Sequence, residues 1–345
     1  MQAVILAAGK STRTYPLTIT KPKPLLKVAN KTLIEHNLDS LNGILDQVII
    51  VVGYKKDLIT GHIGNKYKNI DVKYVEQKFQ LGTAHAVSLA EPYIKDRFVL
   101  MMGDDIYSKN DIKKCMRHRY SILIKKVRNP KIFGVVVKKS GLLVDFEEKP
   151  KKFVSNFVNT ACYCLDKKIF KFIRKIRKSE RNELELPDAI KLLTKDRKVH
   201  CVVAKLWIPI GYPWDLLKAD RILRKNKNII GNKSKIYGNV ENSSIGSGCI
   251  IKGKIKNSII MDKTIVGTNS IVEDSVIGEN VFFQGTILSR NNSLSIIKNG
   301  KIRVGRIGAI ISDNVTAKNV VIEPGSKIWP NLSLSNKIIG GDVRL

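Results

Sequence analysis

Residues 6–13 read LAAGKSTR and residues 21–26 read KPKPLL, and these two stretches decide the fold of the N-terminal part of the chain. The apolar residues before the glycine predict a short buried strand, and the small residues around it let backbone N–H groups approach an anion. Arg13 adds a guanidinium that binds phosphate oxygens in pairs, and Lys23 adds a compact second charge. The combination indicates a triphosphate-binding turn at the end of a strand.

A nucleotide-binding P-loop is the main alternative, because residues 9–12 read GKST, like the end of GxxxxGK[ST]. That motif places its first glycine at position 4, which is Val4 inside the apolar run. The spacing therefore excludes a P-loop. A plain strand-to-helix turn with surface lysines is the other interpretation, and the second stretch argues against it.

Residues 6–26 resemble the signature of the sugar-1-phosphate nucleotidylyltransferases, which is roughly LAAGxGTRxxP followed by KP[LM]. The resemblance implies that Ala8 and Gly9 bind the nucleotide and that Arg13 and Lys23 are catalytic cations. Ser11 departs from the pattern, because most members have glycine there. A serine loses backbone freedom if this position needs a positive φ.

Composition indicates a folded protein of about two domains, with 345 residues of which 43% are hydrophobic. The sequence has no apolar run near the roughly 18 residues of a membrane span and no signal-peptide pattern, so we expect a cytoplasmic protein without a membrane partner. Its 5 cysteines form no CxxC pair and are expected to be reduced core thiols.

The net charge of +31, from 61 basic and 30 acidic residues, raises the question of nucleic-acid binding. The lysines are spread through the whole chain, in short blocks interspersed with apolar periodicity. No pattern of basic and aromatic residues typical of a nucleic-acid fold accompanies them. We therefore interpret the charge as a solvated surface and expect no nucleic-acid partner.

Residues 1–228 alternate apolar runs with helical patterns, which predicts an α/β domain whose ligand lies beyond the carboxyl ends of its strands. Thr32 and Glu35 indicate a capping box before a helix that follows the signature. Strands are predicted at residues 47–52, 72–75, 98–102 and 200–204.

Residues 229–345 have a different pattern, with an apolar residue every six positions at Ile265, Ile271, Ile277 and Phe283. These hexapeptide steps predict the short sides of a parallel β-helix, interrupted by an insertion at residues 289–303. The segment resembles the left-handed β-helix that commonly follows the catalytic domain in this family. The predicted fold is thus a Rossmann-like nucleotidyltransferase domain with a mixed, mainly parallel sheet, plus a C-terminal left-handed β-helix, and the resemblance implies a homo-oligomer, a trimer or higher.

Residues 76–86, EQKFQLGTAHA, look like the base-reading segment of the family. Gln77 offers a donor and an acceptor that match the edge of uracil or thymine, and Gly82 lets backbone approach the ring. Asp104 follows an apolar strand within MMGDD, and by resemblance it is the Mg²⁺ ligand. Asp105 is interpreted as a supporting residue or the start of a helix.

Further downstream, four residues resemble the sugar-phosphate half of the family's site. The carboxylate of Glu148 can accept hydrogen bonds from sugar hydroxyls, Lys149 can hold the sugar phosphate, and Gly134 and Asn159 can position the ring. Ala161 replaces the glycine that usually follows Asn-Thr. The Glu-Lys-Pro sequence is equally compatible with an ordinary turn.

Pro209 stands where relatives usually have the aspartate that completes the metal site, in WIPIG at residues 207–211. Mg²⁺ would then depend on Asp104, phosphates and water, or recruit Asp215; one or two carboxylates suffice for this ion.

The resemblance implies transfer of a nucleotidyl group from UTP or dTTP to glucose 1-phosphate or N-acetylglucosamine 1-phosphate. A catalytically silent sugar-nucleotide-binding subunit is one alternative. An additional acetyltransferase in the β-helix is another, although all 5 histidines lie before residue 229.

Overall fold

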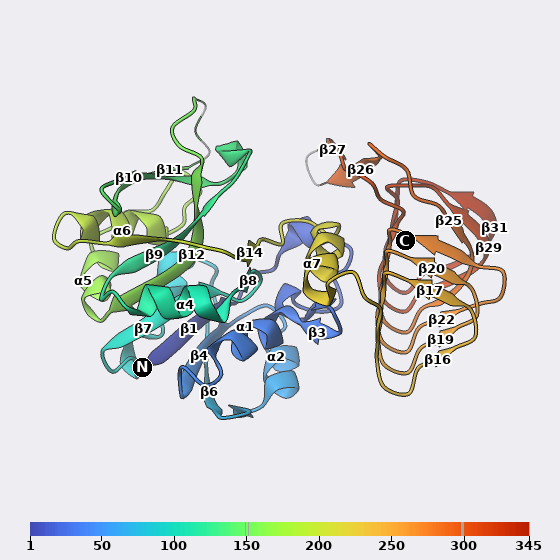
Figure 1. Ribbon diagram of the computed structural model, residues 1–345, viewed down its shortest axis with the longest axis horizontal. Helices are drawn as coiled ribbons and strands as arrows, with labels where there is room; N and C mark the ends of the chain where they lie inside the picture. Colours follow the sequence, from blue (N-terminus) through green and yellow to red (C-terminus); the bar gives the residue numbers. More distant parts are fainter. Residues whose placement is uncertain (149, 151, 298–299, 345) are drawn as a thin grey trace. The chain divides into compact units, whose positions relative to one another are not determined.

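The computed structural model describes residues 1–148, 150, 152–297 and 300–344. The chain, shown in Figure 1, divides into two compact units. The first unit consists of Met1–Lys10 and Ile34–Pro209, and the second of Ser11–Leu33 and Ile210–Leu345. The segment that continues the signature thus belongs, by its contacts, with the C-terminal part of the chain. The domain boundary expected from the sequence, between residues 228 and 229, separates two continuous stretches of chain, whereas each compact unit contains two stretches. That domain boundary stays a prediction.

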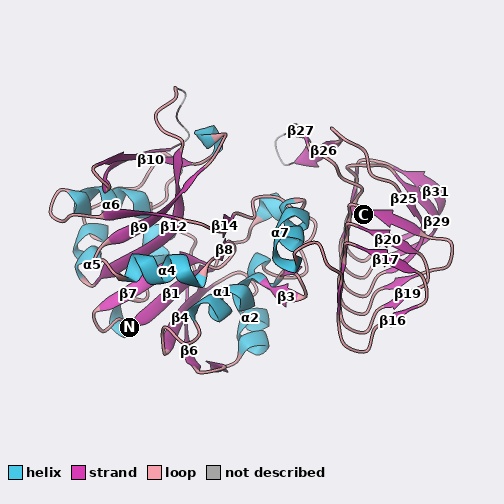
Figure 2. Ribbon diagram, viewed as in Figure 1, coloured by secondary structure: helices cyan, strands magenta, loops and turns pink. Residues whose placement is uncertain are grey.

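In the described part of the first unit, a mixed ten-stranded sheet is flanked by helices (Figure 2). Its strands, in spatial order, are β10 (Gly134–Lys139), β11 (Leu142–Glu148), β13 (His200–Val203), β9 (Ser121–Lys126), β12 (Phe157–Asp166), β7 (Arg97–Met102), β1 (Gln2–Ala7), β4 (Gln47–Val52), β6 (Ile70–Glu76) and β5 (Lys66–Tyr67). The helices are α1 (Leu33–Leu41), α2 (Lys56–Ile63), α3 (Thr83–Ser88), α4 (Lys109–Met116), α5 (Lys168–Ile173) and α6 (Leu186–Thr194).

The central strands β7, β1, β4 and β6 run parallel, and every residue of β1 is buried. Alternate residues such as Val4 and Leu6 pack into the same core cluster as residues of α3, α5 and α6, while Ile5 is buried toward the opposite face. A strand covered on both faces is apolar along most of its length, which explains the continuous hydrophobic run at residues 3–7. The strands predicted from sequence are confirmed, with ends that differ by up to two residues.

Strand β12 runs antiparallel to both of its neighbours, β7 and β9. An antiparallel strand begins at the edge where its parallel neighbours end. The start of β12 is therefore placed at the carboxyl edge of β7, which brings residues distant in sequence to one edge of the sheet. A short pair of strands, β8 (Ile106–Tyr107) and β14 (Trp207–Ile208), extends the structure beyond β7.

The second unit contains the β-helix and helix α7 (Asp215–Arg224), together with the short strands β2 (Lys27–Val28) and β3 (Lys31–Thr32). Successive coils pair in parallel register, so that Ile245, Ile260, Ile277, Ile311 and Ile328 lie one above another. One side of the coils is formed by β15 (Ile229–Ile230), β18 (Ser244–Ile245), β21 (Ile259–Ile260), β24 (Val276–Ile277), β28 (Ile310–Ile311), β30 (Lys327–Ile328) and β32 (Asp342–Val343). The other sides contain β16 (Lys235–Ile236), β17 (Asn239–Glu241), β19 (Ile250–Ile251), β20 (Lys254–Lys256), β22 (Ile265–Val266), β23 (Ile271–Glu273), β25 (Phe282–Ile287), β29 (Thr316–Ile322) and β31 (Ser333–Ile339).

Asparagine residues occupy many of the corners of the coils, where the backbone has a positive φ. Asparagine tolerates this conformation better than most residues with a side chain. The Asn314 side chain accepts a hydrogen bond from Asn280 and donates one to Asn331, at 3.3 and 3.0 Å, so that the corners form a ladder. The predicted insertion is a hairpin of β26 (Leu294–Ile297) and β27 (Gly300–Arg303). The predicted α/β domain with a mixed sheet, followed by a parallel β-helix, is confirmed.

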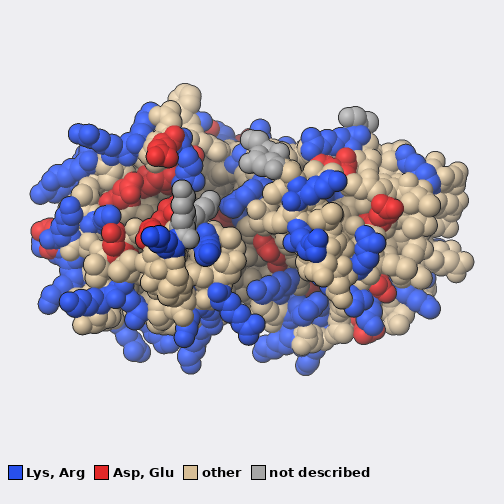
Figure 3. Space-filling model, turned by 90° about the horizontal axis from the view of Figure 1, so that it is seen from above, with Lys and Arg blue, Asp and Glu red and all other residues tan. Residues whose placement is uncertain are grey.

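None of the described helices is long and apolar enough to cross a membrane. The 5 cysteines are free thiols, and 4 of them are buried, as expected for core residues. Lysine and arginine side chains are dispersed over the face shown in Figure 3 rather than gathered in one patch.

Candidate active site

The sheet register of the first unit brings four of the candidate residues to one edge. Leu6 pairs with Met102, and Val52 pairs with both Ala7 and Glu76, so β7, β1, β4 and β6 end together. The residues that follow these strands include Ala8, Gly9, Gln77 and Asp104, as the sequence predicts. Open parallel sheets bind ligands beyond this carboxyl edge.

The turn after β1 is held by hydrogen bonds to the carbonyl oxygen of Ala8. This oxygen accepts the backbone N–H of Tyr54 at 3.0 Å and the side-chain amide of Gln80 at 2.8 Å. A Cβ atom on Gly53 would lie 2.8 Å from the same oxygen, so only glycine fits there. Gly9, the next residue along, is exposed, which leaves its backbone accessible to a ligand. The roles of Gln80 and Gly53 were missed by the sequence analysis.

Gln77 lies directly after β6 and is 6% exposed. Its side-chain nitrogen lies 3.2 Å from the Gly82 carbonyl oxygen, to which it donates, and 3.0 Å from His85 Nδ1. Gly82 precedes α3 with a φ of +102° and approaches Leu184 so closely that a Cβ would lie 2.4 Å from its carbonyl oxygen. Gln77 is thus oriented by the turn that Gly82 makes possible.

Asp104 and Asp105 leave the end of β7 but differ in their surroundings. The Gly103 N–H donates to the Leu6 carbonyl at 2.8 Å, which keeps the turn close to β1. The carboxylate of Asp105 accepts the Trp207 indole N–H at 3.0 Å, so Asp105 supports the β8–β14 pair. Asp104 is half-buried at the same edge.

Gly134, Glu148 and Asn159 also lie together. Gly134 pairs with Glu148 between β10 and β11, and Val135 pairs with Val158, which places Gly134 beside Asn159. The Asn159 side chain accepts the Ala161 N–H and donates to the Tyr163 hydroxyl, both at 2.7 Å. This amide therefore shapes a bulge in β12. Lys149 lies outside the described residues.

Arg13 and Lys23 belong to the second unit, in the segment Ser11–Leu33. The Ser11 carbonyl accepts the Thr14 hydroxyl at 2.7 Å and the Thr18 hydroxyl at 2.9 Å, which fixes the turn that presents Arg13. Ser11 has a φ of 51°, so the glycine that the family pattern places here would suit the conformation. Arg13 is exposed, whereas Lys23 is 4% exposed.

Asp215, the predicted substitute for the metal ligand missing at Pro209, has a structural role. Its Oδ2 atom accepts the backbone N–H groups of Gly211 at 2.8 Å and Tyr212 at 2.7 Å. Burial raises the pKa of Asp215, while these N–H groups and Lys23 act in the opposite direction. In the described ranges, no three His, Cys, Asp or Glu side chains are grouped to hold a metal ion.

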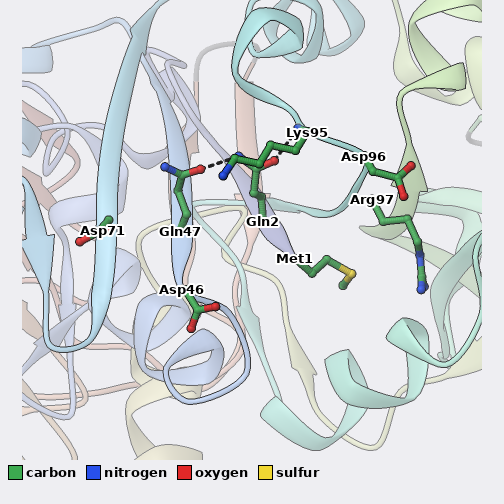
Figure 4. Close-up of a pocket in the computed structure, with 8 residues that line it drawn as sticks. All are labelled: Met1, Gln2, Asp46, Gln47, Asp71, Lys95, Asp96 and Arg97. Carbon is green, nitrogen blue, oxygen red and sulfur yellow. Dashed lines mark hydrogen bonds between the residues drawn. The ribbon is translucent and has the colours of Figure 1, made fainter.

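A hollow of about 520 Å³ lies at the opposite, amino edge of the same strands (Figure 4). The Gln2 side chain spans it, donating to Gln47 at 2.5 Å and accepting the Lys95 N–H at 2.7 Å. None of the candidate residues lines this hollow, which is bounded by the strand starts. The candidate site is therefore at the carboxyl edge.

Comparison with known proteins identifies the family. The model of the Nucleotidyl transferase family matches residues 2–226, and the model described as GlmU-like, C-terminal hexapeptide matches residues 226–290. The chain belongs to the nucleotidyl transferase family and is an enzyme of that class. The predicted family is thus confirmed.

Relatives with both parts match nearly the whole chain. Bifunctional protein GlmU of Methanocaldococcus jannaschii is 34% identical over 96% of this chain and 92% of its own length. A bifunctional sugar-1-phosphate nucleotidylyltransferase/acetyltransferase of Sulfurisphaera tokodaii is 32% identical over 95% of this chain and 94% of its own. A Bacillus anthracis chain assigned as a glucose-1-phosphate thymidylyltransferase, solved in complex with sucrose, is similar with a TM-score of 0.60 and 26% identity, covering 66% of this chain and 97% of that one.

Proposed function

We propose that this chain transfers a nucleotidyl group from UTP or dTTP to a sugar 1-phosphate, either glucose 1-phosphate or N-acetylglucosamine 1-phosphate, and releases pyrophosphate. The observation that supports this most is the shared carboxyl edge of β7, β1, β4 and β6. It brings together a glycine turn, an amide for the base and a carboxylate, from residues far apart in sequence.

Two sets of residues bind the nucleotide in this proposal. Ala8, Gly9, Gln77 and Gly82 receive the nucleoside, with the Gln77 amide reading the pyrimidine edge. Arg13 follows Gly9 by four residues, so covalent geometry alone keeps the two Cα atoms within about 14 Å of each other. A guanidinium so close to the turn is suited to the β- and γ-phosphates, with Lys23 as the second cation.

In this proposal the sugar phosphate is bound by Gly134, Glu148, Lys149 and Asn159 of the first unit. The Glu148 carboxylate accepts hydrogen bonds from hydroxyl groups of the sugar. Gly134 leaves room for this carboxylate, and Asn159 shapes the neighbouring strand. Lys149 holds the phosphate in this assignment. These roles follow from the resemblance together with the pairing of Gly134 and Glu148.

The donor chemistry at Asp104 fits Mg²⁺, because a carboxylate, phosphate oxygens and water are the ligands that this ion prefers. When bound, the ion neutralises charge on the phosphates. Asp104 is the residue proposed to hold it. Asp215 is assigned no ligand role, since its Oδ2 atom is occupied by two backbone N–H groups.

The reaction needs no covalent intermediate on the enzyme. An oxygen of the sugar phosphate forms a bond with the α-phosphorus as the bond from that phosphorus to the bridging oxygen of pyrophosphate breaks. Both reactants are strongly anionic, so the residues have to align them against repulsion and stabilise charge on the departing group. Arg13 and Lys23 do so at the pyrophosphate end.

The test is a matrix of sugar 1-phosphates and nucleoside triphosphates, assayed by pyrophosphate release with Mg²⁺. We expect release with a pyrimidine triphosphate and either of the two named sugar phosphates. One methyl group discriminates weakly, so both UTP and dTTP should react. Binding of a sugar nucleotide with no release in any combination would instead support a silent regulatory subunit, the alternative that Pro209 suggests.

Acetyl transfer is a second candidate because the Sulfurisphaera tokodaii relative is named for both activities. The β-helix of this chain has no histidine to serve as the base, which argues against it. Thiol release from acetyl-CoA with glucosamine 1-phosphate would establish the activity. We further propose a cytoplasmic homo-oligomer, a trimer or higher, which light scattering would detect.

A further inference from the structure

We call Ser11–Leu33 the signature segment. Two of its lysines are bound by acidic side chains of the β-helix within the second unit. Lys21 Nζ lies 2.7 Å from Glu279 Oε1 and 3.1 Å from Asp313 Oδ2, in ion pairs that lack directed hydrogen-bond geometry. Lys27 Nζ donates to Asp262 Oδ2. The two lysines flank Lys23, so the segment is held on both sides of that proposed catalytic cation.

The three acidic residues occupy equivalent positions on successive coils. Each lies two residues after an isoleucine of the column Ile260, Ile277 and Ile311, which are paired in register. We call Asp262, Glu279 and Asp313 the acidic column. Adjacent coils are about 4.8 Å apart, so like charges stacked at this spacing repel unless cations lie between them. Lys21 and Lys27 supply those cations.

The two aspartates of the column divide their oxygens between the coils and the segment. Asp313 Oδ1 accepts the Glu279 N–H at 2.7 Å, and Oδ2 accepts the Thr20 hydroxyl at 2.5 Å. Asp262 Oδ1 likewise accepts the Ser247 N–H at 2.9 Å, while its other oxygen binds Lys27. Because each carboxylate is anchored to a coil by one oxygen, the other fixes where the segment lies.

Uncharged contacts extend this attachment along the segment. The Ser312 hydroxyl donates to the Pro16 carbonyl at 3.1 Å, and the rings of Tyr15 and Trp329 meet edge to face at 5.8 Å. Tyr15 and Pro16 lie two and three residues beyond Arg13. The β-helix therefore fixes the segment on which both proposed phosphate-binding cations are located.

We propose that the acidic column is a positioning element for nucleotidyl transfer, acting through the signature segment on Arg13 and Lys23. The proposal rests on the function proposed above. Phosphoryl and nucleotidyl transfer depend on placement, and a displacement of about 1 Å can cost about 100-fold in rate. The β-helix then contributes to the reaction of its own chain, besides any part in assembly.

The experiment compares Asp313→Asn and Asp262→Asn with Asp274→Asn, all in the full-length chain. Asp274 is a matched control, since it is 3% exposed and pairs with Arg306 and Arg221, both outside the signature segment. We expect the two column variants to lose about 10- to 100-fold in kcat, with the KM for sugar 1-phosphate unchanged. The control should keep its kcat within about twofold, because Asp274 binds arginines outside the signature segment, and its replacement leaves the placement of Arg13 and Lys23 intact.

Lys21→Met tests the same contact from the other partner and replaces Asp313→Asn if that variant does not fold. The double variant Lys21→Met/Asp313→Asn should lose no more kcat than the more impaired of the two single variants, because the two residues act through one contact. Equal kcat values in the column variants and the control, at equal folded fractions, would overturn the proposal.

A wild-type chain that releases no pyrophosphate would refute the proposed function without deciding this inference. Calorimetric titration with inorganic pyrophosphate then decides it. A dissociation constant for pyrophosphate that is at least tenfold larger in Asp313→Asn or Lys21→Met than in Asp274→Asn supports the positioning role. Equal affinity in these variants, or no binding by the wild-type chain, contradicts it.

Discussion

The carboxylate of Glu148 lies directly over Gly134, where a Cβ atom would be 2.9 Å from Glu148 Oε2. A side chain at position 134 therefore displaces the group proposed to bind the sugar. The obstructing atom is the end of a flexible, exposed side chain, so the strand itself can stay in place.

From this contact we expect Gly134→Ala to raise the KM for sugar 1-phosphate about tenfold, the cost of one weakened hydrogen bond to a charged group. The KM for the nucleotide should stay unchanged. Gly61→Ala is the control, because a Cβ there meets nothing within 4 Å. An unchanged sugar phosphate KM in Gly134→Ala would remove Glu148 from the sugar site.

Replacement of Arg13 tests the pyrophosphate end. We expect Arg13→Ala to lower kcat by about two orders of magnitude or more, as for other lost transition-state donors. Lys10→Ala is the matched control, since Lys10 is an exposed cation of the same turn. Steady-state pyrophosphate release measures both, and near-normal turnover in Arg13→Ala would exclude the assigned role.

Ser11 and Ala161 have φ values of 51° and 54°, at the two places where the family pattern has glycine. A left-handed conformation costs residues with a Cβ about 1 kcal/mol or more. Ser11→Gly and Ala161→Gly should each raise the free energy of unfolding by up to about 1 kcal/mol, measured by urea titration. Ala189→Gly in α6 should lower the free energy of unfolding, because glycine is unfavourable within a helix. An increase at this position would contradict the explanation by backbone conformation.

Asp104→Asn and Asp215→Asn should affect the Mg²⁺ requirement differently. Asp104→Asn is expected to raise the Mg²⁺ concentration for half-maximal activity by about tenfold or more. Asp215→Asn should leave that concentration unchanged but lower the melting temperature, because Asp215 binds the N–H groups of Gly211 and Tyr212. A large shift in the Mg²⁺ requirement of Asp215→Asn would restore its predicted role as a ligand.

His118 and His200 stack with ring centroids 4.0 Å apart. Burial, His200 and Arg117 lower the pKa of His118 from its usual value of 6.5. The folded state thus favours the neutral ring, so this contribution to stability is present above pH 6.5 and is lost as the pH falls through the lowered pKa. His118→Gln should reduce the decline in melting temperature from pH 7.5 to pH 5, and a decline identical to that of the wild-type chain would contradict the assignment.

The sequence predicted the strand ends and the coils because both follow from local patterns. Gln77 and Asp104 follow strands of the parallel core. Three of these strands, β1, β4 and β7, are mostly buried, and β6 alternates buried and exposed residues, so the hydrophobic pattern marks them. The occupied carboxylate of Asp215, the indole bond of Asp105 and the close approach of Gly82 to Leu184 could not be predicted. Each depends on a partner whose distance along the chain has no local signature.

The acidic column has features that the sequence alone determines and contacts that only the tertiary structure decides. The chain alone places an acidic residue two positions after an isoleucine on three coils, and its charges at Lys21 and Lys27 are equally visible. That these groups meet is decided only by the tertiary structure, because the coil register and the path of the signature segment bring residue 21 to residue 313. The sequence by itself determined the family, the elements and the chemistry of the side chains, since these depend on residue type and short-range spacing. Folding alone decided which of those side chains are free to meet substrate and which are bound by the protein itself.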